Sequence, residues 1–364
     1  MAVYKIFPIA DATLYSDLGS TNTGLDPILD LSKQVSYYYP SHSAVTRAIV
    51  KFSNTDLDEV FTKYIGTSSY TSNFRAYVAD AINIPTDLTI ELRALAEDFD
   101  MGTGKYGDSP VNTTGVSWKY RRANETQPWQ SSSYAAGTTG SYTDGNVGGG
   151  TWYTGSVCTQ SFGVYSDKDL NIDVTEIIAN YRTGSYVNHG LLLSNTSSIE
   201  FDPNYTYQYN LFSRDTNTIY PPCLELKWDD SVYQPISQNN ICSNGNITLA
   251  LQNNATNYSL ESVVKFRVNV RDKYPTRVFS TGSLYTNQKY LPETSYYSVV
   301  DYKTGDVLID FDENYTKISA DSKGGHFSLF MQGLQPYRYY KIVIKSVIDD
   351  EVVLFDNDYI FKIE

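Results

Sequence analysis

The stretch Arg47-Ala48-Ile49-Val50-Lys51-Phe52 contains one of several short apolar runs in the first half of the chain. The others have a similar length and spacing: Ala12 to Tyr15, Ile28 to Leu31, Phe74 to Val78 and Thr89 to Leu95. Turn-forming residues separate them, among them Gly19, Gly24, Pro27, Pro40 and Pro85. Short runs punctuated in this way are typical of a β-sandwich or a barrel. The first half is therefore predicted to be a β-sandwich with few helices.

The composition favours sheets throughout. Of 364 residues, 33 are Tyr, 15 are Phe and 4 are Trp, whereas only 3 are Met. Aromatic and β-branched side chains suit the pleated, half-buried surface of a sheet. With 41% hydrophobic and 19% charged residues, the chain is too apolar for a disordered protein. Its length predicts two domains.

Two helices are expected within this β pattern. The first begins at Thr55 and ends at Gly66. The second has Asp173 as its N-cap and Glu176 at the spacing of a capping box, and it ends at Gly184.

From Ile247 the strand rhythm continues to the end of the chain, and Lys303-Thr304-Gly305-Asp306 predicts a hairpin turn. A polar, Pro-bearing and Asn-rich segment at 229–246 precedes this half and is expected to hold the domain boundary. We predict a jelly-roll domain over residues 1–232, a linker over 233–246 and an Ig-sized sandwich over 247–364.

The charge excludes some partners. The chain has 28 Lys and Arg against 41 Asp and Glu, a net charge of −13, and both sides of Trp228 are acidic. Proteins that bind by neutralising phosphates need the opposite sign, so no nucleic-acid partner is expected. No run is long enough for a membrane span, and the start does not have the pattern of a signal peptide. The cysteines, Cys158, Cys223 and Cys242, are expected to be reduced thiols.

Catalytic and metal-binding patterns are weak. None of His42, His189 and His326 has a partner at a catalytic or metal-ligating spacing. Acidic clusters at 97–100, 310–313 and 356–358 are typical of solvated strand ends, and no EF-hand loop is present for calcium. We expect no enzyme activity, no catalytic residue, no metal and no cofactor.

The segment from Asp100 to Ser166 is predicted to be a long loop rich in Gly, Ser, Thr and scattered aromatic residues. Its large side chains could stack on sugar rings, fold the loop onto its own domain, or fill a protein interface. We favour packing or an interface, with side chains partly exposed in the isolated chain and covered in an assembly. The candidate contact residues are Trp118, Tyr120, Arg121, Arg122, Trp129, Trp152 and Tyr153.

Several pieces of the first half resemble the DNRLRE family of jelly-roll modules, which is similar to carbohydrate-binding modules. They are Asp11-Ala12-Thr13-Leu14-Tyr15, Arg47 to Phe52, Gly115-Val116-Ser117-Trp118, Asp173-Val174-Thr175, Gly190-Leu191-Leu192-Leu193 and Pro222-Cys223-Leu224-Glu225-Leu226-Lys227-Trp228. This resemblance implies a jelly roll and raises carbohydrate binding as a function.

A further resemblance concerns tailed bacteriophages related to the T4 group. Gly115 to Tyr120, Glu200-Phe201-Asp202 and Phe212 to Tyr220 are similar to segments of their virion structural proteins. The resemblance implies a structural protein assembled into a virion in the host cytoplasm.

In the second half, Gly333-Leu334-Gln335-Pro336 followed by Tyr340 resembles the corner of a fibronectin type III or Ig-like module. There the Tyr hydroxyl bonds to nearby backbone, which explains a polar-tipped aromatic residue at a buried corner.

Together these observations predict an all-β protein with an N-terminal jelly roll and a C-terminal Ig-like sandwich. The expected function is that of a non-enzymatic structural component of a phage particle, at the neck or collar, in the tail, or as capsid decoration. Its partners would be other virion proteins in a symmetric homo-oligomer, with neither nucleic acid nor membrane. The alternative is a carbohydrate-binding module that contacts a host surface polysaccharide.

Overall fold

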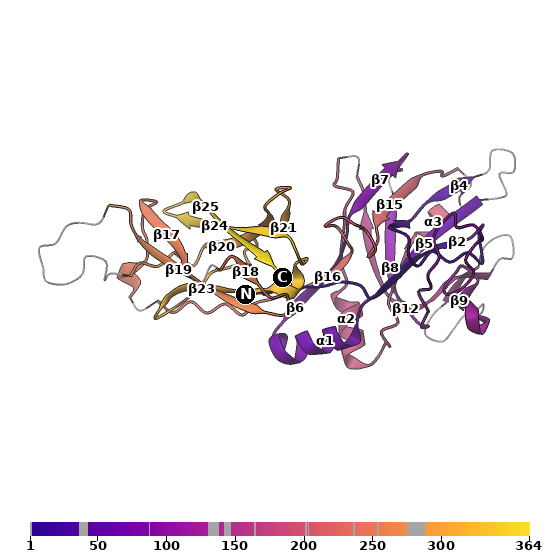
Figure 1. Ribbon diagram of the computed structural model, residues 1–364, viewed down its shortest axis with the longest axis horizontal. Helices are drawn as coiled ribbons and strands as arrows, with labels where there is room; N and C mark the ends of the chain where they lie inside the picture. Colours follow the sequence, from indigo (N-terminus) through magenta and orange to yellow (C-terminus); the bar gives the residue numbers. More distant parts are fainter. Residues whose placement is uncertain are drawn as a thin grey trace, which may run out of the picture. The chain divides into compact units, whose positions relative to one another are not determined.

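The computed structural model describes residues 2–35, 43–86, 88–129, 138–141, 147–163, 165–200, 202, 204–235, 237–252, 255–274 and 288–364. The described part is all-β, with short helices between antiparallel sheets (Figure 1). The predicted fold class is confirmed. The chain divides into an N-terminal unit, Ile6–Tyr64 with Thr71–Glu225, and a C-terminal unit, Met1–Lys5, Ile65–Tyr70 and Leu226–Glu364.

The largest sheet of the N-terminal unit is built from the short apolar runs. Its strands follow the order β11 (Thr138–Ser141), β12 (Val147–Ser161), β8 (Thr89–Leu95), β14 (Leu191–Asn195), β5 (Ser43–Lys51) and β2 (Ala10–Tyr15), and β4 (Lys33–Val35) also pairs with β5. In β8 the side chains of Ile90, Leu92 and Ala94 are buried, whereas the residues between them are partly exposed. This alternation places one face of the sheet on the core.

Smaller sheets complete this part of the chain. One has the order β3 (Ile28–Asp30), β15 (Gln208–Phe212) and β7 (Val78–Ile82), and β9 (Tyr120–Arg122) pairs with β10 (Gln127–Pro128). Another has the order β1 (Ala2–Ile6), β16 (Cys223–Trp228), β6 (Tyr70–Ala76) and β13 (Leu170–Asp173). The division between the units falls inside β1, β16 and β6.

The two predicted helices are present with shifted ends. The first, α1 (Asn54–Val60), is capped by the Ser53 hydroxyl, which accepts from the Asp56 amide at 3.2 Å, and it continues as a π-helical segment, η1 (Phe61–Ile65), up to Gly66. The second, α2 (Thr175–Thr183), ends as predicted at Gly184, which has a φ of 75°. That left-handed conformation favours glycine.

The predicted capping box of α2 is wrong. The N-cap position is Val174, although the Asp173 carboxylate accepts from the Thr175 amide at 2.9 Å. Glu176 instead accepts a hydrogen bond from the Ser156 hydroxyl at 2.8 Å, because β12 lies within its reach. The short helical segments α3 (Ser197–Glu200), η2 (Ala123–Glu125), η3 (Gln238–Asn240) and η4 (Met331–Gly333) were not expected.

The prediction of a long loop from Asp100 to Ser166 is wrong for Val147–Ser161, which form the strand β12. Its glycines and polar residues hide the strand periodicity, and the ladder with β8 shifts register between Trp152 and Val157. Such a bulge breaks the alternation that sequence patterns rely on.

The C-terminal unit is a two-sheet sandwich. One sheet has the order β17 (Ile247–Gln252), β19 (Val263–Asp272), β23 (Gly324–Phe330) and β22 (Ser319–Asp321). The other has the order β18 (Asn257–Tyr258), β25 (Glu351–Ile363), β24 (Tyr339–Ile348), β20 (Ser295–Asp301) and β21 (Val307–Ile309). This is the strand arrangement of an Ig-like sandwich.

The predicted tyrosine corner is confirmed. The Tyr340 side chain is buried, and its hydroxyl donates to the Gln335 carbonyl at 2.8 Å. Phe361 packs against the Tyr340 ring, with ring centroids 5.7 Å apart. The hydroxyl therefore anchors the start of β24 to the turn that precedes it.

The division between the units differs from the predicted linker at 233–246. It falls at Glu225–Leu226, and the polar segment that follows belongs to the C-terminal unit. The Gln234 amide donates to the Ala320 carbonyl at 2.7 Å, and the Cys242 amide donates to the Tyr290 carbonyl at 2.8 Å. Backbone pairing of this kind leaves little trace in side-chain polarity. Within the described residues, no helix has the length and apolar character needed to cross a membrane.

Candidate functional site

Arg47 is a charged side chain inside the N-terminal unit. It comes from β5, where the residues that follow it, Ala48 to Val50, are buried and apolar. Its guanidinium binds both carboxylate oxygens of Glu200, with Nε to Oε1 at 3.0 Å and Nη2 to Oε2 at 2.7 Å, and Nη1 donates to the Gly149 carbonyl at 2.9 Å. The two side chains are only 4% and 3% exposed. A bidentate pair of this type is strong and directional.

Two of the predicted contact residues lie against this guanidinium. Its central carbon is 5.1 Å from the ring centroid of Trp118 and 5.3 Å from that of Trp152. Cation–π attraction strengthens as water is excluded, and here Trp118 is 0% exposed. The neighbouring β12 backbone also lies close to Trp118, because a Cβ at Gly149 would lie 2.8 Å from the indole.

Partial exposure in the isolated chain was expected for Trp118, Trp129 and Trp152; it is wrong for Trp118 and Trp129, which are buried, whereas Trp152 is partly exposed. Tyr153, another candidate contact residue, is also buried. Trp129 donates from Nε1 to the Ser117 carbonyl at 3.0 Å. Tyr153 stacks on Tyr186 with ring centroids 4.1 Å apart. These rings hold their segments on their own unit, one of the alternatives left open by the sequence.

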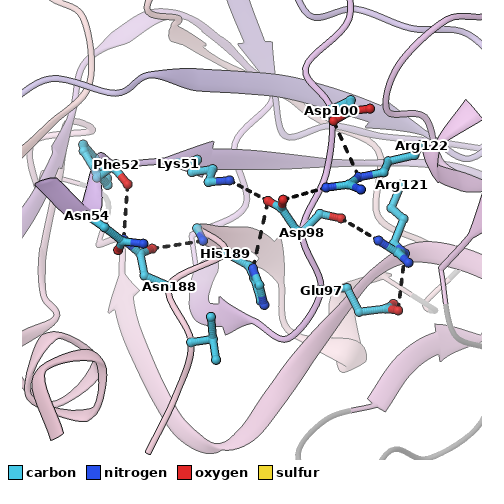
Figure 2. A network of polar contacts seen from close by, with 12 residues as sticks. Lys51, Phe52, Asn54, Glu97, Asp98, Asp100, Arg121, Arg122, Asn188 and His189 are labelled. Carbon is cyan, nitrogen blue, oxygen red and sulfur yellow. Dashed lines mark hydrogen bonds and ion pairs between the residues drawn. The ribbon is translucent and has the colours of Figure 1, made fainter. Parts of the chain in front are cut away.

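Tyr120, Arg121, Arg122 and Trp152 are partly exposed. Their proposed role as contact residues stays a prediction. The two arginines extend from β9 toward the acidic segment that follows β8 (Figure 2).

Asp98 is the centre of that contact. Figure 2 shows Lys51 and Arg122 directed at its carboxylate, with nitrogen-to-oxygen distances of 2.5 and 2.8 Å, and His189 at 4.0 Å. Arg121 donates to the Asp98 carbonyl at 3.2 Å. Burial alone would raise the pKa of Asp98, but the Lys51 ammonium, together with the Phe99 amide and His189, holds that pKa below its ordinary value.

The rest of the acidic cluster at 97–100 is also paired. Glu97 lies 3.4 Å from Arg121 and accepts from the Thr151 hydroxyl at 2.6 Å, and Asp100 lies 3.5 Å from Arg122. Burial lowers the pKa of His189, an effect that Asp98 opposes. The positive charges of Lys51, Arg121 and Arg122 balance the carboxylates of this segment. Their ion pairs connect β5, β9 and the segment after β8.

A separate groove of about 390 Å³ opens on the N-terminal unit beside β2 and β3. Tyr15 and Tyr106 pack together in its wall with ring centroids 5.1 Å apart. Three carboxylates, Asp17, Asp26 and Asp30, line the same space. A volume of this size accommodates a small ligand or part of a polymer.

The groove carboxylates influence one another. Burial raises the pKa of Asp30 to about 6, and the charge of Asp17 adds to the rise. Burial also raises the pKa of Asp26, although the Tyr106 amide donates to both of its oxygens at 3.0 Å. This site could not be predicted from the sequence, because its residues come from β2, β3 and the segment near 106, which lie far apart along the chain.

The other two histidines considered in the sequence, His42 and His326, form no catalytic arrangement within the described residues. His42 lies outside them, and His326 Nδ1 lies 3.5 Å from Asp321, which also binds Arg267 at 2.6 Å. In the part of the chain that the structure describes, no three His, Cys, Asp or Glu side chains are grouped as metal ligands would be.

No protein-family model matches the chain, and no curated protein matches it. The resemblances to DNRLRE modules and to phage virion proteins therefore stay predictions.

Proposed function

We propose that this protein is a non-enzymatic structural component of a tailed phage particle, in a neck or collar, in the tail, or as capsid decoration. It acts through contacts with other virion proteins, within a symmetric homo-oligomer. The observation that carries the proposal is an apolar surface on the C-terminal unit.

This surface, here called the outer face, is the side of the five-stranded sheet that points away from the core. Its apolar residues are Tyr339, Val343 and Val347 of β24 and Val352 and Leu354 of β25. Val352 and Leu354 are 64% and 60% exposed, whereas Phe355 next to them is buried.

The ladder brings these side chains together. Val347 pairs with Val352, and Lys345 pairs with Leu354. Directly opposed residues of an antiparallel pair lie on the same side of the sheet, so Val347, Val352 and Leu354 lie together on the outer face, beside Lys345. Covering a Val or Leu side chain gains roughly 1.5–3 kcal/mol, which makes the outer face suited to a protein contact.

Particle assembly with variant protein tests the proposal. Leu354→Lys and Val352→Lys should fold, because both side chains point to solvent, but should enter particles poorly in competition with the wild type. Val187→Lys is the matched control, since Val187 is 55% exposed on the N-terminal unit. Equal incorporation of all three variants would overturn the role of the outer face.

In the carbohydrate-binding alternative, Trp118 and Trp152 were expected to stack on sugar rings. Both indoles lie against Arg47, and Trp118 has no exposed surface for a sugar ring. The groove beside Tyr15 and Tyr106 is the feature that favours this second function.

A further inference from the structure

The groove has an uneven distribution of charge. Asp17, Asp26 and Asp30 line it, and no Lys or Arg is among its described lining residues. Lys105 acts on Asp26 from outside the lining. Asp30 is also desolvated by its surroundings, and the hydrogen bond that it accepts from the Ser32 hydroxyl offsets only part of the cost of its charge. A cationic group in the groove would relieve this cost, whereas an anionic ligand would increase it.

The remaining walls suit a polyhydroxylated ring. Tyr106 is 60% exposed and offers the face of an aromatic ring beside Tyr15. Gln34, Gln208 and Asn210 contribute amides, each with donors and acceptors for hydroxyl groups. Among the described residues, the buried Oδ1 of Asn210 has no hydrogen-bond partner.

We infer that this groove binds an amino sugar of a polysaccharide, with the sugar ring against Tyr106 and the ammonium group beside Asp17, Asp26 and Asp30. The inference rests on the carbohydrate-binding alternative and is independent of the outer face. A neutral sugar would use the amides and the Tyr ring but would leave the carboxylates repelling one another. A uronic acid would add a fourth negative charge. A simple polyamine would meet the carboxylates but leave the ring face and the amides unused.

Calorimetric titration of the full chain with four matched ligands tests the inference at pH 7. They are a glucosamine trisaccharide, its N-acetylated form, a galacturonic acid trisaccharide and spermidine. We expect the glucosamine trisaccharide to bind at least about tenfold more tightly than the other three, since one charge-assisted contact in a partly desolvated site is worth about that factor.

Two variants separate the parts of the site. Asp30→Asn should weaken binding of the glucosamine trisaccharide about tenfold and leave the weak binding of the N-acetylated form unchanged. Tyr106→Ala should weaken both. Asp310→Asn, which removes one exposed carboxylate from the C-terminal unit, is the control for net charge and should change neither.

Equal or tighter binding of the N-acetylated or acidic sugar, equal binding of spermidine, or no binding in any titration would overturn the inference. The particle role is tested separately, by incorporation of the Asp30→Asn variant into particles. Incorporation at the wild-type level would show that the particle role does not depend on ligand binding in the groove.

Discussion

Replacement of Arg47 by Met should strongly destabilise the N-terminal unit. The substitution keeps an unbranched side chain between Trp118 and Trp152 but leaves the Glu200 carboxylate, 3% exposed, without its bidentate partner. Removing one member of a buried ion pair costs about 3–5 kcal/mol, because the remaining charge stays desolvated. Loss of cation–π contacts with two indoles adds to this cost.

A second replacement distinguishes the effect of a buried charge without its ion-pair partner from the effect of lost packing. In Arg47→Met with Glu200→Met, no buried charge of the pair remains, so the double variant should be more stable than Arg47→Met, by less than the full penalty because the buried Lys33 loses the favourable charge of Glu200. Urea denaturation followed by Trp fluorescence measures both, since two indoles contact the guanidinium. Lys63→Met, which breaks the exposed pair with Glu59, should leave the midpoint unchanged. A loss below about 1 kcal/mol for Arg47→Met would refute this account of the pair.

Three further predictions concern other parts of the fold. Burial raises the pKa of Asp11 from 3.8 to about 7, so between these pH values the folded state holds a proton that the unfolded state has released. The resulting stability is lost as the pH rises from about 4 to 7, and Asp11→Asn should flatten this decline in the urea midpoints, whereas equal slopes for variant and wild type would contradict the prediction. Tyr340→Phe removes the hydrogen bond to Gln335 and should lower the stability of the C-terminal unit by about 1 kcal/mol in thermal unfolding, with no change expected in the N-terminal unit. Gly149→Ala places a Cβ 2.8 Å from Trp118 at a φ of 77° and should destabilise the N-terminal unit by about 1–3 kcal/mol in urea, and a neutral effect would show that the strand can move away.

The parts of the fold that the sequence predicted are those with strong local signals. The alternation in β8, the glycine that ends α2 and the Gly-Leu-Gln-Pro corner before Tyr340 each depend on residues close together in the chain. In those places local geometry and tertiary packing favour the same conformation.

The features that were missed depend on contacts between distant residues. β12 is a strand because β8 and β11 pair with it, although its own glycines argue against one. Residues 233–246 were expected to be a linker because they are polar, but the Gln234 amide bonds to β22. Periodicity carries no information about such partners.

The candidate sites follow the same rule. The sequence singled out Trp118 and Trp152 as large side chains in a Gly-rich segment, but only the fold places Arg47 between them. The groove was missed because Tyr15, Asp30 and Tyr106 form no motif along the chain.

The proposed particle role is tested most directly by quantitative mass spectrometry of purified phage particles that carry the gene for this chain. The account predicts that the chain is present in intact particles at a fixed copy number, a multiple set by the symmetry of one ring or capsid site. In-particle cross-linking should join Lys341 or Lys345, which lie on the outer face, to another virion protein or another copy. A chain that is made during infection but absent from intact particles would contradict the account.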